Sequence, residues 1–398
     1  MRIALALLFL SLPAAYAQTK DATPSPPPSA PGLPKPAPSK DAAAVKFEKF
    51  ELKDTKLINA LRVIRAKAYN QGELIDVVLV DPKNELGERM VNLKLLNVTV
   101  DTTLGYLAAL ADFQYVITGN VVTVEPKLEP TKADVPYAGT TELRQTLNVY
   151  APATKPAKPA PVIFWIHGGG WRGGEKTNVQ LKPKFFTNLG YVFVSTNHRY
   201  VSAVPMNEIF ADVAKSLRWT HDHAAEFGGD PNRIVIMGHS SGAQLAAYLA
   251  IDERPLKAEG LSLKMFRGCV PVDADTFDIP AVIALATANR KAAGKPEPKH
   301  GHREIFGGQP ERWTDYSAVT HVAAGKGIPP FLILYDAAAA LTPDQAKRLE
   351  GALTAKGIPA KAFGAQNTNH GKINSDLGLD SDPSTAEVRA FLKSVLAN

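Results

Sequence analysis

The segment Gly238-His239-Ser240-Ser241-Gly242 places a serine between two glycines in a G-x-S-x-G pattern. This pattern is typical of a sharp strand-to-helix turn that holds a serine hydroxyl clear of the edge of a sheet, where it can act as a nucleophile. The glycines fit such a turn because a Cβ at either position would collide with the neighbouring strand or helix. The same letters also occur in ordinary strand-to-helix turns, so the flanking residues must decide.

Both flanks have the composition that the turn requires. Residues 233–237 are β-branched and apolar, as in a buried strand, and residues 243–250 are small and unbranched, as helices favour. A second glycine motif, HGGGW at 167–171, follows the predicted strand 162–166. Consecutive glycines at the end of a strand can turn backbone N–H groups toward a developing oxyanion. A plain glycine loop is the alternative, and the strand and helix alternation between the two motifs argues against it.

Five segments then carry a family resemblance, from about Val135 to the C-terminus. In chain order they read HGGGW, NHRY, LRWTHDHAAEFGGDPNRIVIMGHSSGAQLAA, PPFLILYD and NTNHGKIN. This series resembles the α/β-hydrolase serine esterases, particularly bacterial carboxylesterases akin to feruloyl esterases and arylformamidases. The resemblance implies an α/β fold class, with a mostly parallel sheet and helices on both faces. It also implies the chain order nucleophile, acid, histidine.

The family pattern assigns roles to individual residues of this chain. It makes Ser240 the nucleophile and His370, after the last predicted strand at 359–364, the general base that takes and returns the serine proton. A surface loop histidine is the alternative interpretation of His370. The oxyanion donors that the resemblance implies are the backbone N–H groups of Gly169, Gly170 and Ser241.

The acid is where this chain departs from the family pattern. Relatives carry an aspartate in a short loop after the strand that corresponds to residues 331–335, but here the loop 336–341 reads DAAAAL. We predict Asp336, at the end of the strand, as the acid. Asp344 is the other candidate, although it falls where a helix begins and an aspartate favours the helix dipole. If neither serves, the enzyme is expected to be weak.

Residues 1–17 have the features of a secretory signal peptide, with a positive start, an apolar run and a small-residue cleavage site. We therefore expect an exported protein, periplasmic or secreted. The apolar run is too short to span a membrane, and no later segment is long and apolar enough, so the protein is not expected to be membrane-spanning. Residues 18–44 are rich in Pro, Ala, Ser and Lys, and we predict a disordered linker there.

A small α+β unit is predicted at 45–127, with the element order βαββαββ. The last two strands are expected to pair across the turn dipeptide Gly119-Asn120. This unit resembles the short N-terminal domain of secretins and TonB-dependent receptors, and the likeness implies docking onto a protein or envelope partner. A unit that only aids folding or spacing is the alternative. The catalytic domain is predicted at 135–398.

Composition and the remaining candidate ligands exclude other classes of function. The chain has 398 residues and a net charge of +6, without a basic stripe interleaved with aromatics, so we expect no nucleic-acid binding. The single cysteine, Cys269, cannot form an intrachain disulfide and is expected in the core. We expect no cofactor and no metal, because the remaining histidines lack partners at ligand spacing; these are His221, His223, His300 and His302.

The sequence thus predicts an exported serine esterase for short acyl or aryl esters, with a small-molecule ester or an acylated carbohydrate as substrate. A degenerate hydrolase fold kept for binding is the second hypothesis, and arylformamidase or peptidase chemistry on the same residues is the third. Specificity is expected from the long connection that contains Asp278 and Trp313, where the basic loop 291–303 is expected to overhang the site.

Overall fold

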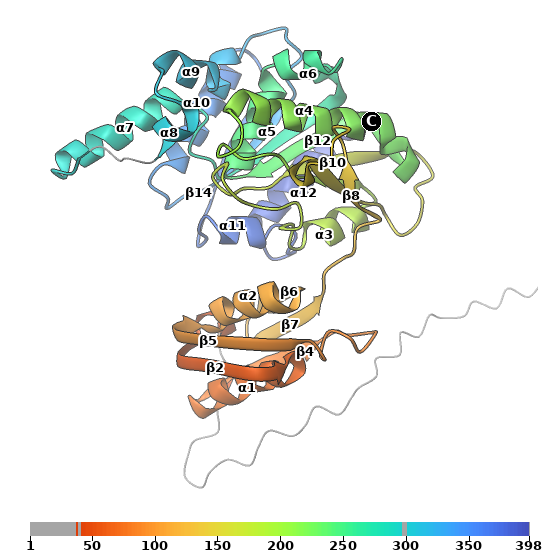
Figure 1. Cartoon of the computed structure of the whole chain (residues 1–398), viewed down its shortest axis with the longest axis vertical. Coiled ribbons are helices and arrows are strands. Elements are labelled where there is room, and N and C mark those ends of the chain that lie inside the picture. Colours follow the sequence, from red (N-terminus) through yellow and green to blue (C-terminus); the bar gives the residue numbers. More distant parts are fainter. Residues whose placement is uncertain (1–36, 39–40, 297–300, 398) are drawn as a thin grey trace, which may run out of the picture.

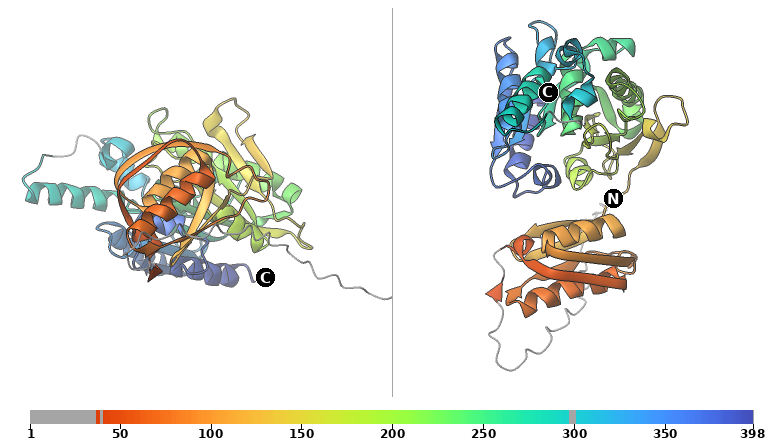
Figure 2. Two further views of the ribbon diagram at one scale, coloured as in Figure 1. Left: turned by 90° about the horizontal axis from the view of Figure 1, so that it is seen from below. Right: turned by 60° about the vertical axis from the view of Figure 1, so that its left-hand side comes forward.

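The computed structural model describes residues 37–38, 41–296 and 301–397 (Figure 1). The predicted signal peptide and most of the predicted linker lie outside the described residues. The described chain forms an N-terminal module, residues 42–126, and a sheet domain, residues 132–397, with separate hydrophobic cores. Figure 2 shows two further views, and in the right-hand one the module again lies below the sheet domain.

The N-terminal module is built from two small sheets and two helices. Strands β2 and β5 pair antiparallel, and the second sheet has the order β4-β7-β6. Phe50, Ile64 and Leu104 are fully buried between the sheets and helices. The element order is the predicted one with the short β3 added. The elements are η1 (Ala42–Ala44), β2 (Lys46–Lys56), α1 (Leu57–Asn70), β3 (Glu73–Leu74), β4 (Asp76–Leu79), β5 (Met90–Thr99), α2 (Val100–Ala111), β6 (Phe113–Thr118) and β7 (Val121–Pro126).

Two details concern the ends of this module. The residue pair β1 (Ala37–Pro38) lies parallel to β3. Residues 42–44, at the end of the predicted linker, form the 3₁₀ helix η1, whose Ala42 is buried and donates its N–H to the Gly119 carbonyl oxygen at 2.9 Å. The hairpin β6–β7 turns at Gly119-Asn120, as the dipeptide predicts.

The described part of the sheet domain contains an eight-stranded sheet in the order β15-β14-β13-β12-β10-β11-β9-β8. The neighbouring strands β15, β14, β13, β12, β10 and β11 run parallel to one another. Strand β9 pairs antiparallel with β11, and β8 pairs antiparallel with β9 at the edge of the sheet. The mostly parallel sheet implied by the family resemblance is confirmed. The strands are β8 (Lys132–Pro136), β9 (Thr146–Tyr150), β10 (Ala160–Ile166), β11 (Val192–Thr196), β12 (Gly229–His239), β13 (Phe266–Val272), β14 (Phe331–Asp336) and β15 (Ala360–Ala365).

Helices cover both faces of the sheet because its central strands are apolar on both sides. In β10, Phe164 packs in the core under α4, α5 and α10, while Trp165 packs in the core under α3 and α12. The helices are α3 (Lys182–Asn188), α4 (Met206–His223), α5 (Ser241–Ile251), α6 (Arg254–Ala258), α7 (Ile279–Ala292), α8 (His302–Phe306), α9 (Pro310–Asp315), α10 (Thr342–Thr354), α11 (Lys372–Ser375) and α12 (Pro383–Val395). Four 3₁₀ helices are described as well: η2 (Leu143–Gln145), η3 (Ala224–Phe227), η4 (Leu263–Met265) and η5 (Ala318–His321).

Cys269 is buried in β13 as a free thiol, in agreement with its predicted core role. Among the described residues, no helix has both the length and the apolar character needed to cross a membrane.

A buried ion pair ties the segment after β11 to α4. The Arg199 guanidinium donates to both carboxylate oxygens of Asp212 at 2.8 Å, and the Arg199 N–H donates to the same group at 3.1 Å. Gln145 adds a fourth hydrogen bond at 2.7 Å. Because the Asp212 side chain is fully buried, these donors replace the water that its charge would otherwise need.

We expect Arg199→Ala to lower the free energy of unfolding of the sheet domain by about 3–5 kcal/mol, because it leaves a buried carboxylate without its cation. Guanidinium unfolding followed by tryptophan fluorescence measures this, since all four tryptophans belong to the sheet domain. The control is Arg348→Ala, which breaks a pair with the exposed Asp344 and a pair with the partly buried Asp278, and should cost at most about 1 kcal/mol. Equal losses in the two variants would contradict the assigned role of the pair.

Candidate active site

The G-x-S-x-G turn joins β12 to α5 with Ser240 at its tip. Ser240 has φ 55° and ψ −122°, a strained backbone conformation for a residue with a Cβ. A Cβ on Gly238 would lie 2.3 Å from the Gly242 carbonyl oxygen, and a Cβ on Gly242 would lie 2.3 Å from that of Ile166. The Ser240 N–H donates to the Val272 carbonyl oxygen at 2.9 Å, which fixes the turn to β13. Both glycines are therefore required by close backbone approach.

His370 lies on the loop between β15 and α11 and faces the serine. Its Nε2 is 3.0 Å from the Ser240 Oγ, and its Nδ1 is 2.7 Å from the Asp273 Oδ2. A serine, an imidazole and a carboxylate in this order and at these distances can deprotonate the serine hydroxyl and stabilise the imidazolium that results. The structure brings Ser240 and His370 together as predicted, but with a different acid.

The prediction that Asp336 orients His370 is corrected by this geometry. The Asp336 backbone N–H donates to the Asp273 Oδ1 at 2.9 Å, and its own carboxylate accepts the Ala338 N–H at 2.9 Å. The alternative candidate, Asp344, pairs with Arg348 at 2.7 Å in the first turns of α10. The physical reason is the strand order: β13 lies between β12 and β14, so the end of β13 is nearer to the serine turn than the end of β14.

Asp273 could have been found from one sequence signal. It is the first residue after the buried apolar strand β13, and parallel strands bring their carboxyl ends to one edge of the sheet. Its φ of 53° directs the backbone away from the strand immediately. The strand order cannot be read from the sequence alone, and the family pattern places the acid after β14.

Burial and hydrogen bonding have opposing effects on the pKa of Asp273 and on the pKa of His370. Burial alone would raise the pKa of Asp273, whose side chain is fully buried, but the hydrogen bonds from His370 and the Asp336 N–H prevail and hold the pKa below its ordinary value. The hydrogen bond to Asp273 raises the pKa of His370 above its ordinary value, against the effect of its own partial burial. The carboxylate is therefore ionised at neutral pH and stabilises the imidazolium form of His370.

His239, the residue before the nucleophile, positions the histidine loop. Its Nε2 lies 2.8 Å from the His370 carbonyl oxygen, so Nε2 must carry the proton and donate it. Burial, foremost, lowers the pKa of His239 to about 3, which keeps the ring neutral at physiological pH. The second residue of the serine motif thus fixes the backbone that carries His370.

The glycine loop after β10 lies against the serine. A Cβ on Gly168 would be 2.9 Å from the His239 carbonyl oxygen and 3.1 Å from the Ser240 Cβ, so a larger residue there would displace the serine turn. Gly169 and Gly170 have φ values of 134° and 62°, and their N–H groups donate to no protein acceptor within the described residues. Ser241 is the first residue of α5, where N–H groups have no partner inside the helix. These are the three donors that the family resemblance implies.

Long-range contacts hold this loop in place. Arg144, in η2, donates to the Gly174 carbonyl oxygen at 2.9 Å and pairs with Glu175. At the other end of the loop, the Trp171 Nε1 donates to the Gln244 Oε1 of α5 at 3.2 Å. Arg144 lies outside the five family segments, and Gln244 lies within the third one, but nothing in the sequence pattern points to either contact.

The connection between β13 and β14 lies over the glycine loop. Phe306, in α8, packs edge-on against Trp171 with 5.0 Å between ring centroids. His302 lies 3.4 Å from the Asp275 carboxylate, close to the acid at Asp273. The predicted overhang of this connection therefore involves α8, while His300 lies outside the described residues.

The other singled-out residues of the connection have structural contacts. Asp278 caps the N-terminus of α7 through the Ala281 N–H, and the Trp313 indole donates to the Gly307 carbonyl oxygen. His221 and His223 lie in the last turn of α4 beside single acidic neighbours. Within the residues that the structure describes, no group of three or more His, Cys, Asp or Glu could hold a metal ion.

We expect Asp273→Asn to lower kcat by about 10⁴-fold, because the amide favours the wrong tautomer of His370 and cannot stabilise the imidazolium. Initial rates on p-nitrophenyl acetate measure this. The matched control is Asp344→Asn, which changes an exposed residue of α10 and should retain activity. A larger loss in Asp344→Asn than in Asp273→Asn would contradict the assignment.

The pH dependence of kcat/KM tests the same interaction between Asp273 and His370. The neutral form of His370 is the base, so kcat/KM falls as the pH drops through its pKa. Since Asp273 raises that pKa, Asp273→Asn should move the acidic limb of the residual activity to lower pH. An acidic limb that does not move would mean that Asp273 does not act on His370.

Comparisons with known proteins agree with the fold. A family model described as BD-FAE matches residues 147–353, slightly more than half of the chain. The carboxylesterase NlhH of Mycobacterium tuberculosis is 32% identical over 126 residues, covering 31% of this chain and 39% of the relative. Esterase B1 of Culex pipiens is 33% identical over 118 residues, covering 27% of this chain and 22% of the relative. The chain thus spans well under two thirds of these relatives.

Solved structures resemble the sheet domain at low sequence identity. A truncated carbohydrate esterase from gut microbiota aligns with a TM-score of 0.54 and 19% identity, covering 67% of this chain and 96% of that one. Thermogutta terrifontis esterase 2, phosphonylated by sarin, aligns with a TM-score of 0.53 and 22% identity, again covering 67% and 96%. At such identities the likeness concerns the fold alone.

Proposed function

The chain belongs to the BD-FAE family, and from this premise we propose that it is a serine hydrolase that cleaves carboxylic esters. The observation that carries the proposal is the continuous chain of contacts from Ser240 through His370 to the buried Asp273. The named carboxylesterases among its relatives support the same reaction class.

The first half of the proposed reaction is acyl transfer to the serine. The Ser240 Oγ attacks the ester carbonyl carbon while His370 Nε2 takes the hydroxyl proton, and the carbonyl oxygen becomes an oxyanion. The N–H groups of Gly169, Gly170 and Ser241 would donate to that oxygen, and losing one such donor typically costs about 3–4 kcal/mol of transition-state stabilisation. The tetrahedral species then expels the alcohol, which leaves with the proton from His370.

The second half returns the enzyme to its starting state. Water attacks the acyl-serine with His370 again acting as base, and the carboxylic acid leaves as the proton returns to Ser240. Asp273 stays ionised throughout and holds Nδ1 protonated. The water-excluded position of Asp273 strengthens this interaction, because charges attract more strongly at low local dielectric.

We propose short acyl or aryl esters as substrates. A pocket of about 430 Å³ lies beside the glycine loop, and its wall combines apolar side chains such as Met206 and Phe306 with the charged Arg172, Glu304 and Arg312. Its size suits a small acyl or aryl group. An ester carried on a carbohydrate is the finer form of this proposal, supported by the carbohydrate esterase among the structural neighbours.

Two alternative functions compete with ester hydrolysis, and each is distinguished from it in a different way. The degenerate-fold hypothesis rests on the alanines at 337–340 and on the docking-like N-terminal unit, and the Asp273 contact removes the first of these two motives. Arylformamidase or peptidase chemistry would use the same residues, so a panel of p-nitrophenyl esters, N-formyl anilines and peptide anilides divides it from ester hydrolysis.

Export and docking remain proposals drawn from the sequence. We propose that residues 1–17 direct the chain to the periplasm or the medium, and that the N-terminal module positions the sheet domain against a protein or envelope partner. Fractionation of cells that express the full chain tests the first proposal.

We expect Ser240→Ala to lose p-nitrophenyl acetate hydrolysis by about 10⁶-fold, because no other group supplies the nucleophile. A fluorophosphonate probe should label the wild type at Ser240 and leave Ser240→Ala unlabelled, as peptide mass spectrometry would show. The control is Ser394→Ala on α12, which should label like the wild type. Full activity in Ser240→Ala, or no labelling of the wild type, would overturn the proposed function.

A further inference from the structure

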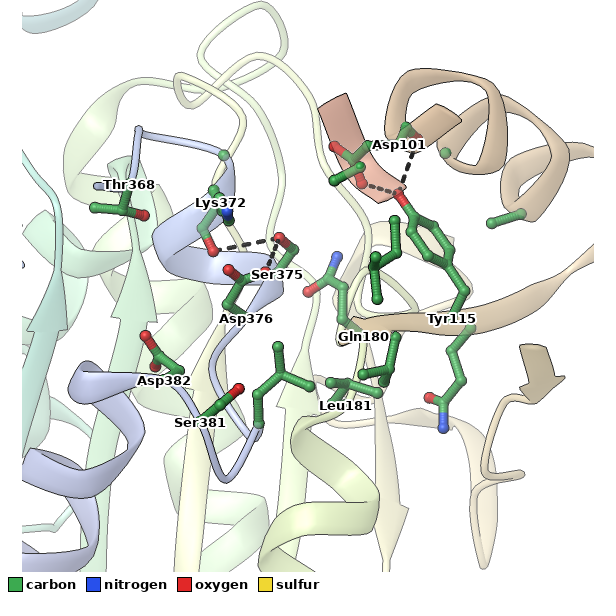
Figure 3. A pocket seen from close by; sticks show the side chains of 18 of the residues that line it. Asp101, Tyr115, Gln180, Leu181, Thr368, Lys372, Ser375, Asp376, Ser381 and Asp382 are labelled. Carbon is green, nitrogen blue, oxygen red and sulfur yellow. Dashed lines mark hydrogen bonds between the residues drawn. The ribbon is translucent and has the colours of Figure 1, made fainter. Parts of the chain in front are cut away.

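A cleft of about 810 Å³ lies between the N-terminal module and the sheet domain (Figure 3). The module contributes α2 and β6 to one wall. The sheet domain contributes the segment 177–181 before α3, and the segment from 366 through α11 to the start of α12. Figure 3 shows Asp101 and Tyr115 of the module across from Gln180 and Asp376 of the sheet domain. The volume is in the range of sites that bind small ligands.

This cleft borders the catalytic histidine loop. Asn369 and Gly371, the two neighbours of His370, both line it, as do Asn367 and Thr368. Thr177 lines it from the segment that follows the glycine loop. A molecule in the cleft would therefore lie next to the loop that carries the general base.

Neutral hydrogen-bonding groups dominate the polar part of the walls. Carboxamides can both donate to and accept from hydroxyl groups, and they carry no charge. Six of them line the cleft: Gln114, Asn178, Gln180, Gln366, Asn367 and Asn369. Gln114 is 5% exposed, and its Oε1 has no hydrogen-bond partner in the described part of the chain.

The charged lining opposes an anionic ligand. Two lysines, Lys127 and Lys372, face the cleft together with four aspartates. Those aspartates are Asp41, Asp101, Asp376 and Asp382. Apolar side chains such as Ala108, Ala109 and Leu379 also line the cleft. Such a mixed surface suits a chain whose rings have apolar faces and hydroxyl edges.

One ion pair, Lys184 with Glu125, links the sheet domain to the module beside the cleft. Lys184 of α3 donates to the Glu125 carboxylate of β7 at 2.7 Å, and the other oxygen of Glu125 accepts the Gln114 amide at 2.8 Å. Burial, followed by the charges of Asp382 and Asp101, raises the pKa of Asp376. Since Asp101 belongs to the module, the carboxylates of the two units are close enough to influence each other.

We propose that this cleft binds an uncharged, hydroxyl-rich chain, a neutral oligosaccharide that carries the ester, and that the N-terminal module thereby forms part of the substrate site. The role of the cleft as a substrate site rests on the proposed esterase function, but binding of the oligosaccharide does not require catalysis. The module then selects esters on an extended neutral chain over small free esters.

Two blocking substitutions, one from each wall, test the cleft without removing an internal contact. Ala109, on the exposed side of α2, and Ser381, before α12, both line the cleft and are exposed. Ala109→Trp and Ser381→Trp should fill it. Leu110→Trp is the matched control, because Leu110 is the next residue of α2, is 53% exposed and does not line the cleft.

Calorimetry with the full chain measures binding directly. Unmodified xylohexaose and cellohexaose are the neutral probes, and hexagalacturonate is the anionic one. We expect at least one neutral hexasaccharide to bind, with affinity lowered about ten-fold or more by each blocking substitution and unchanged by Leu110→Trp. Absence of binding by both neutral probes, preference for hexagalacturonate, or equal affinity in all variants would overturn the proposal.

Kinetics separate this proposal from the proposed function. The readout is the ratio of kcat/KM on O-acetylated xylohexaose to kcat/KM on p-nitrophenyl acetate. The ratio should fall about ten-fold in both blocking variants and stay constant in Leu110→Trp. A constant ratio in the blocking variants contradicts the role of the cleft, whereas failure of the wild type to hydrolyse p-nitrophenyl acetate contradicts the esterase function and leaves the calorimetric result to decide the cleft.

Discussion

The Asp273 carboxylate is fully buried, and its charge is stabilised by the His370 imidazole and by the backbone N–H of Asp336. An ionised carboxylate in such a place would be very costly without these partners. The same interaction fixes which nitrogen of His370 is protonated, and so turns Nε2 toward the Ser240 Oγ. The tautomer, the orientation of the ring and the basicity of His370 all depend on this one hydrogen bond.

The fold provides this contact through the order of three adjacent strands. β12 ends in the serine turn, β13 ends in Asp273, and β14 ends in the N–H that supports Asp273. The Ser240 N–H also bonds to the last residue of β13, so the nucleophile and the acid share one strand end. His239 adds a neutral donor to the His370 backbone. The site is therefore built by register within the sheet, and its strain at Ser240 is held by closely packed glycine neighbours.

The parts of the site that depend on neighbours in the chain could be predicted from the sequence. The serine turn, the glycine loop and the loop histidine are each specified by neighbours in the chain, and the structure brings Ser240 and His370 to 3.0 Å. Asp273 was missed because its role depends on which strand lies beside β12, and strand order is not a local property. Arg144 and Gln244 support the glycine loop through contacts with residues far away in the sequence. The cleft between the N-terminal module and the sheet domain could not be predicted from the sequence for the same reason, since its walls come from separate folding units.

The most direct test of the Asp273–His370 interaction is to detect the proton that the two side chains share in their hydrogen bond. Proton NMR of the full chain at low temperature should show a strongly deshielded resonance from the His370 Nδ1–H. The account predicts that this resonance is present in the wild type and in Asp344→Asn, and is absent in Asp273→Asn. Its absence from the wild type, or its persistence in Asp273→Asn, would contradict the claim that Asp273 holds the catalytic histidine.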